Sequence, residues 1–301
     1  MAGPQLIRDF SFVYGAAERL SPRIRRVLAR NPGPFTDKGT GTYIVGHGTV
    51  AVIDPGPALP DHAAALLAAL DGETVSHILV TNTHRDHSPA AAALGRATGA
   101  PTLAFGPHGT PPAPGGGEEG ADHDFAPDRL LRDGDVVEGP GWHLAAVHTP
   151  GHTSNHLCFA LAEEKVLFSG DHVMGWSTTV VAPPDGDMAR YVASLERLLS
   201  REDAVYWPTH GPAIRDPHPH VRGFIAHRRE RKAAILRRLA DGASDIPGLV
   251  AALYAGLDPR LAPAAGRSVH AHLIELMAEG QVAAEAAPDA AARYRLVTRR
   301  R

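Results

Sequence analysis

The segment Asn82-Thr83-His84-Arg85-Asp86-His87 gathers several potential metal ligands within six residues. Imidazole and carboxylate groups at this density are typical ligands of a divalent ion such as zinc. The segment directly follows residues 78–81, whose continuous apolar character predicts a buried central strand. The sequence therefore predicts a metal site in the polar loop where this strand ends.

Three further potential ligands stand in short polar segments later in the chain. They are His152 in Thr-Pro-Gly-His-Thr, Asp171 in Phe-Ser-Gly-Asp-His, and His210 in Pro-Thr-His-Gly-Pro. Each follows a predicted strand, so all three can converge with the first segment at one edge of a sheet. His148, His156 and His172 lie beside these ligands and either orient them or simply pack. The remaining histidines, His108 among them, are most simply surface or packing residues.

The elements that must position these groups alternate between strands and helices. Residues 35–53 predict a hairpin that ends at Asp54-Pro55-Gly56, and residues 61–70, 90–97 and 188–199 predict helices. The chain contains too many hairpins for a doubly wound parallel sheet, so a sandwich with outer helices fits better. From Phe224 onward the pattern is helical, and residues 281–287 and 292–297 predict a hairpin around Pro288-Asp289. We therefore expect a catalytic domain over 1–223 and a small winged-helix-like domain over 224–301.

Composition limits the cellular setting and the partners. The chain has 301 residues, one cysteine (Cys158) and no apolar run long enough for a membrane span, which favours a cytoplasmic protein without internal disulfides. Residues 1–226 hold 17 Lys/Arg and 25 Asp/Glu, whereas residues 227–301 hold 13 and 8. This basic C-terminal segment either contacts a polyanion such as RNA or forms a solvated helix face.

The loop at 82–87, followed by His152, Asp171 and His210, resembles the His-x-His-x-Asp-His pattern of the metallo-β-lactamase superfamily. The resemblance spans about residues 35–212 and implies an α+β fold, the αββα metallo-β-lactamase sandwich. It also implies that Asp54 supports the ligand loop from behind. Residues 175–179 and the winged-helix-like tail look most like the β-lactamase-like protein 2 subgroup. That subgroup includes animal endoribonucleases and related fungal thioesterases.

The chain departs from the pattern at Asn82, which occupies the first histidine position. By analogy His84, His152 and position 82 hold a first ion, Asp86, His87 and His210 hold a second, and Asp171 lies between them. An amide oxygen is a weak neutral ligand beside imidazole, so we expect the second site to fill first and the first to be weak or empty. The cofactor is thus one or two zinc ions, and this ligand chemistry does not separate zinc from iron.

Zinc lowers the pKa of a bound water to about 7 and so provides hydroxide at neutral pH. With a single ion another group must act as base, and Asp86 and Asp171 are the nearest candidates. His84 or His152, where not bound to metal, can hold the water or protonate a leaving group. The subgroup resemblance implies that the pocket is lined by Ser177, Thr178 and Thr179.

The leading function is zinc-dependent hydrolysis of an ester, thioester or related acyl bond in a small-molecule substrate, because an acidic main domain is poorly suited to a polyanion. The alternative is an endoribonuclease acting on single-stranded RNA, supported by the basic tail and the subgroup. Hydrolysis of β-lactams and a non-enzymatic binding module with a degraded metal site are further alternatives. The tail is expected to pack on the catalytic domain or to form a homodimer contact rather than insert into a DNA groove.

Overall fold

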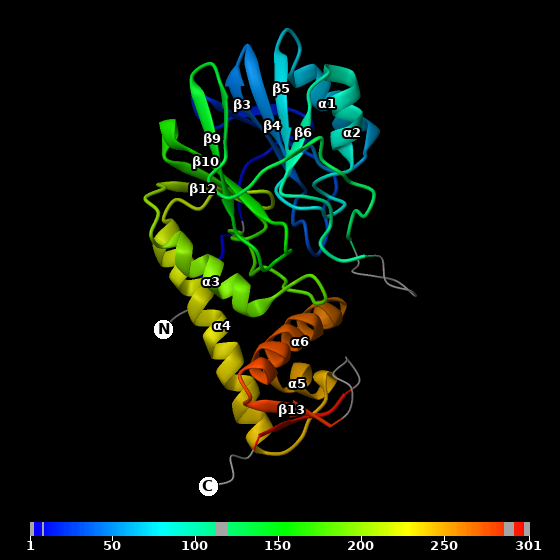
Figure 1. Cartoon of the computed structure of the whole chain (residues 1–301), viewed down its shortest axis with the longest axis vertical. Helices are drawn as coiled ribbons and strands as arrows, with labels where there is room; N and C mark the ends of the chain where they lie inside the picture. Colours follow the sequence, from blue (N-terminus) through cyan, green and yellow to red (C-terminus); the bar gives the residue numbers. More distant parts are fainter. Residues whose placement is uncertain (1–2, 8, 112–119, 286–291, 298–301) are drawn as a thin grey trace.

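The computed structural model describes residues 3–7, 9–111, 120–285 and 292–297. Its larger part consists of two mixed β-sheets packed face to face, with helices on both outer faces (Figure 1). The strand order is β1-β2-β3-β4-β5-β6-β7 in the first sheet and β12-β11-β10-β9-β8 in the second. This arrangement confirms the predicted αββα sandwich.

The first sheet contains β1 (Ala17–Arg19), β2 (Ile24–Leu28), β3 (Gly41–His47), β4 (Thr49–Ile53), β5 (Thr74–Leu79), β6 (Thr102–Ala104) and β7 (Arg129–Leu130). The second sheet contains β8 (Val136–Gly139), β9 (Trp142–His148), β10 (Leu157–Leu161), β11 (Val166–Gly170) and β12 (Val205–Pro208). The outer helices are α1 (Pro60–Ala69) and α2 (Ala90–Thr98) on the first sheet and α3 (Met188–Leu198) on the second. A short 3₁₀ helix, η1 (Ala162–Glu164), joins β10 to β11.

Alternation of side chains along the strands builds the four layers. Tyr43 and Val45 of β3 point into the core between the sheets, whereas Ile44 packs under α1 and α2. In β10, Phe159 faces the same central core, and Cys158 faces the outer core beneath α3. Successive residues of a strand point to opposite faces, so continuous apolar strands can fill two cores at once.

The C-terminal part is a helical unit with its own core, and Ala271 within it also packs in the outer core of the second sheet. It contains α5 (Ile246–Leu253), η2 (Pro259–Leu261), α6 (Ala262–Ala278) and the antiparallel pair β13 (Val282–Ala284) and β14 (Tyr294–Leu296). The predicted turn at Pro288-Asp289 lies outside the described residues. The second half of the preceding helix, together with α5 and α6, gives three helices, and the strand pair follows them. This order matches the predicted winged-helix-like arrangement.

That preceding helix, α4 (Pro217–Ala240), belongs to both units (Figure 1). Its first half places Val221 and Phe224 in the outer core of the second sheet, and its second half places Ile235 and Leu239 in the C-terminal core. The boundary predicted between residues 223 and 224 falls inside this helix. None of the helices in the described ranges has both the length and the apolar character needed to cross a membrane.

Candidate metal centre

The predicted ligands all follow strands whose carboxyl ends lie at one edge of the sandwich. β4 and β5 are parallel neighbours, and β9, β11 and β12 run in one direction because β10 is antiparallel to both β9 and β11, and β12 is parallel to β11. The two sheets are joined at this edge. The N–H of Leu157 donates to the carbonyl of Thr81 at 2.7 Å, and that of Gly41 donates to the carbonyl of Thr209 at 2.8 Å.

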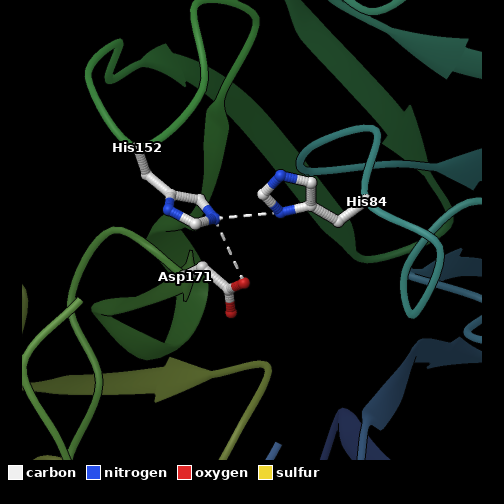
Figure 2. Close-up of side chains that lie close together, drawn as sticks. All are labelled: His84, His152 and Asp171. Atoms are coloured by element: carbon white, nitrogen blue, oxygen red, sulfur yellow. Dashed lines mark hydrogen bonds and ion pairs between the residues drawn. The ribbon is translucent and has the colours of Figure 1, made fainter. Parts of the chain in front are cut away.

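One group of ligands consists of His84, His152 and Asp171, here called the first site. Nε2 of His152 lies 3.1 Å from Nδ1 of His84 and 3.4 Å from Oδ2 of Asp171. Figure 2 shows the three side chains pointing toward one another from three separate loops. The protein therefore supplies three ligand atoms to this site even without position 82.

A second group consists of Asp86, His87 and His210, here called the second site. Nε2 of His210 lies 3.0 Å from Oδ2 of Asp86, and Nε2 of His87 lies 3.8 Å from Oδ1 of Asp86. Asp171 stands between the groups, because its Oδ2 is 3.1 Å from His87 and its Oδ1 is 3.4 Å from His210. The structure thus brings together six of the seven residues predicted as ligands.

Asn82, the seventh, is buried but directs its side chain into its own loop. Its Oδ1 accepts a hydrogen bond from the N–H of His84 at 3.0 Å, and its Nδ2 lies 3.3 Å from Nδ1 of His87. An Asn side chain that binds the backbone two residues further on stabilises a turn. The amide oxygen of Asn82 is therefore occupied by the backbone of its own loop.

Acceptors behind the imidazoles fix the orientation of three rings. Nδ1 of His87 is 2.9 Å from Oδ2 of Asp54, Nδ1 of His152 is 2.7 Å from the carbonyl of Val180, and Nδ1 of His210 is 3.1 Å from the carbonyl of Gly39. A histidine that donates from Nδ1 presents an unprotonated Nε2 to a metal. The three Nε2 atoms accordingly face the space between the ligand groups.

The arrangement fits a bound divalent cation. Ligands about 2.1 Å from a tetrahedral zinc ion lie about 3.4 Å apart, which is close to the separations within the two sites. Oδ1 of Asp171 and Nε2 of His210 are buried, and the ion-pair contacts that they make with each other and with Asp86 lack hydrogen-bond geometry. Such atoms facing one space are expected where an ion completes their coordination.

Charge in the centre favours a cation as well. Burial alone would lower the pKa of His87, but the carboxylates of Asp171, Asp54 and Asp86 outweigh it and hold this pKa well above its ordinary value. Burial alone would raise the pKa of Asp171, but the neighbouring imidazoles of His87 and His210 outweigh it and hold this pKa well below its usual range. Metal binding would displace protons from such imidazoles and use the same carboxylates.

His156 orients the bridging aspartate from behind, which is one of the two roles considered for it. Its Nε2 accepts a hydrogen bond from the N–H of Asp171 at 3.2 Å, and its Nδ1 lies 2.8 Å from the hydroxyl of Thr149. Gly170 leaves room for this ring, because a Cβ there would lie 2.5 Å from Nε2 of His156. His172 is buried against Tyr191, and its ring forms no hydrogen bond within the described residues.

Sequence reasoning missed the proximity of His108 to the centre. Nδ1 of His108 lies 2.9 Å from the hydroxyl of Thr83, and its ring centroid is 6.3 Å from that of His84. The residue is 24 positions from His84 in a Gly/Pro-rich segment, where no spacing pattern connects it to the ligand loop.

The subgroup resemblance implied that Thr179 lines the pocket. Thr179 is instead buried, and its Oγ1 donates to the carbonyl of Asp171.

Residues 36–210 match the metallo-beta-lactamase superfamily, and residues 246–290 match the beta-lactamase associated winged helix domain. The protein therefore belongs to the metallo-beta-lactamase superfamily. The matched range contains both ligand groups and Asp54.

Two solved structures share the fold. A beta-lactamase domain protein from Burkholderia ambifaria is 22% identical, with a TM-score of 0.80 and 96% of each chain covered. A metallo-beta-lactamase family protein from Thermus thermophilus is 25% identical, with a TM-score of 0.74 and 93% and 100% covered.

The curated relatives include several fungal thioesterases. An atrochrysone carboxyl ACP thioesterase of Cryptosporiopsis sp. is 35% identical over 225 residues, which are 74% of this chain and 64% of that protein. A protein of the same name from Paecilomyces divaricatus is 36% identical over 218 residues, which are 71% of this chain and 62% of that protein. This chain therefore spans less than two thirds of the length of these two relatives.

Proposed function

We propose that this protein is a metal-dependent hydrolase that cleaves a thioester, with water and an acyl thioester giving a carboxylic acid and a free thiol. Two three-ligand groups that meet at one sheet edge carry this proposal, because they can hold one or two divalent ions beside a solvent-accessible carboxylate, Asp86. The similarity to the fungal ACP thioesterases supports a thioester on a carrier protein over a simple ester.

A bound zinc or iron ion supplies Lewis acidity, which activates water and polarises the thioester carbonyl. We assign metal binding first to Asp86, His87 and His210, because the first site lacks an imidazole at position 82. Asp171 is then placed to accept the proton of the attacking water. His84 and His152 face the same space and can hold that water and return a proton to the thiolate leaving group.

The alternative of RNA cleavage has less support from the structure. Several basic residues of α4 are engaged by carboxylates rather than arranged as an unpaired stripe. Arg229 pairs with Glu196 at 2.7 Å, and Lys232 lies 2.8 Å from Glu275. An interface for a phosphate backbone requires cations that remain available to it. We therefore place RNA among the outcomes of the test.

The test compares substrates on one metal-defined preparation. Metal-free protein is supplied with zinc, or with ferrous iron under anaerobic conditions, and assayed with an acyl carrier protein thioester, single-stranded RNA and a cephalosporin. A thiol-reactive dye can follow thioester cleavage, because the single cysteine, Cys158, is buried and burial raises the pKa of its thiol to about 12. We expect thioester turnover that a chelator abolishes and metal restores.

The other outcomes are equally informative. Salt-sensitive RNA cleavage without thioester turnover would replace the thioesterase proposal with the endoribonuclease alternative. Turnover of the cephalosporin alone would assign a lactamase activity. Absence of turnover with every substrate and both metals would contradict a hydrolytic role.

A further inference from the structure

Arg228 is a buried cation at the centre of α4, with only 3% of its surface exposed. It follows Val221, Phe224 and Ile225 on the buried face of the helix, at the i, i+3, i+4 and i+7 positions that form one stripe. In the described ranges no carboxylate pairs with its guanidinium. A buried charge without a counter-charge is unfavourable, so the contacts that the guanidinium does make must offset this cost.

The contacts of Arg228 are with the catalytic domain. A guanidinium N–H donates to the backbone carbonyl of Thr179, and the charged group lies 5.2 Å from the centre of the Tyr191 ring. The Tyr191 hydroxyl in turn donates to the carbonyl of His172 at 2.8 Å. A carbonyl dipole and an aromatic face together offset part of the cost of burying the charge.

The segment that Arg228 contacts holds two members of the first site. Oγ1 of Thr179 donates to the carbonyl of Asp171 at 2.7 Å, which fixes the backbone of that ligand. The carbonyl of Val180 accepts from Nδ1 of His152 at 2.7 Å, which sets the orientation of that ring. Movement of Thr179-Val180 would therefore displace both ligands at once.

We propose that Arg228 is a positioning residue that braces Thr179-Val180 from α4 and thereby holds His152 and Asp171 in the geometry of the first site. The inference rests on the proposed metal-dependent function. It gives α4, the helix shared with the C-terminal unit, a role in metal binding. The second site should depend less on Arg228, because it shares only Asp171 with the first site and the supports found behind its own histidines are Asp54 and the carbonyl of Gly39.

The test uses Arg228→Met, which removes the charge and the donors but keeps a long apolar side chain. Arg229→Met is the matched control, because Arg229 is the next residue of the same helix and is exposed, with its ion pair to Glu196 on the surface. Hydrogen exchange of peptides covering 171–187 is measured in the metal-free full-length proteins. Cobalt(II) binding is then followed by visible absorption with chelator competition.

We expect Arg228→Met to raise exchange in 171–187 at least tenfold and to weaken cobalt binding at the first site 10- to 100-fold, the range for loss of a supporting contact. Cobalt binding at the second site, which shares Asp171, should weaken less than binding at the first site, and Arg229→Met should match the native protein in both measurements. If Arg228→Met does not fold, Arg228→Lys takes its place, with a smaller loss expected in the same direction.

Native exchange in 171–187 in the substituted protein would overturn the proposal, as would equal weakening of both sites. Failure of the native protein to bind cobalt at either site would instead contradict the proposed metal centre, and a native first site too weak to bind cobalt would remove only the metal readout. In either case the exchange of the metal-free proteins still decides whether Arg228 braces this segment. The readouts therefore separate failure of the inference from failure of the proposed function.

Discussion

Oδ2 of Asp54 lies 2.9 Å from Nδ1 of His87 in a fully buried contact. The same carboxylate accepts the N–H of Thr81 at 2.8 Å and the hydroxyls of Thr81 and Thr209, each at 2.7 Å. One side chain thus connects the ends of β4, β5 and β12 to a predicted metal ligand. Its removal would affect the fold and the second site together.

Asp54→Ala is expected to lower the free energy of unfolding by about 3 kcal/mol or more, because several buried donors lose a charged acceptor. It should also weaken metal binding at the second site by about 10- to 100-fold. Urea unfolding of the metal-free protein and chelator competition measure the two effects. Asp61→Ala is the control, since Asp61 is exposed in the first turn of α1, and an equal loss in that variant would contradict a special role for Asp54.

His84→Ala should reduce kcat for the thioester at least 100-fold and leave the metal content of the second site near that of the native protein. His84 belongs to the first site, where its Nδ1 lies 3.1 Å from His152. Turnover and metal content are measured on the same samples. His143→Ala, which removes an exposed imidazole, should leave both unchanged. Undiminished turnover in His84→Ala would remove this residue from the mechanism.

Asn82→His should raise the metal content of protein purified without added metal from about one to about two ions per chain. The substitution places an imidazole at the first site and removes the amide oxygen that now accepts from the N–H of His84. Elemental analysis gives the metal content directly. Asn82→Ala, which adds no ligand, should remain near one, and two tightly held ions in the native protein would show that Asn82 does not limit the first site.

Protonation of His62 should make the folded protein less stable in mild acid. Burial lowers its pKa from 6.5 to about 4, and its Nε2 lies 2.9 Å from the hydroxyl of Thr42. Because the folded pKa lies below the unfolded one, the stabilising contribution is complete above pH 6.5 and is lost as the pH falls toward 4. The loss between pH 7 and pH 5 should be about 2 kcal/mol.

Urea unfolding at these two pH values, in the metal-free native protein and in His62→Gln, measures this contribution. The fall in stability from pH 7 to pH 5 should be smaller in the variant by about 2 kcal/mol. His47→Gln, at an exposed histidine, should behave like the native protein. An identical fall in His62→Gln and the native protein would contradict the assignment.

Gly170→Ala should disturb the bridging aspartate by pushing on His156. Gly170 has φ +54, and a Cβ there would lie 2.5 Å from Nε2 of His156, which now accepts the N–H of Asp171. We expect a loss of about 3 kcal/mol in unfolding free energy and weaker binding of metal. Gly72→Ala is a matched control, because Gly72 has φ +74 but open space around it. It should lose only about 1 kcal/mol, and equal losses would show that backbone strain explains both.

Local patterns in the sequence predicted a sandwich with outer helices and the gathering of the ligand segments, and the family resemblance implied the four-layer αββα order. The polar loop after residues 78–81 and the segments around His152, Asp171 and His210 each follow a strand, and strand ends in a sandwich meet at an edge. The order of strands in each sheet was not predicted. That order depends on pairing between segments far apart in the chain, such as β11 with β12.

The contacts that orient the ligands were less accessible to sequence reasoning. The carbonyls of Gly39 and Val180 support two histidines, but a backbone acceptor leaves no mark in the residue type at its position. Arg228 did leave a signal, since a charged residue on the apolar stripe of a helix is unexpected. Its partner Thr179 lies 49 positions away, so the pattern could not reveal the contact.

The continuity of α4 has a consequence for motion. A helix of 24 residues extends about 36 Å, and here it replaces the flexible linker that would otherwise join the two domains. A hinge between them would require breaking backbone hydrogen bonds in the middle of the helix and exposing Arg228. The two units are therefore expected to move as one body, so any change in access to the candidate metal centre is expected in the loops at the sheet edge.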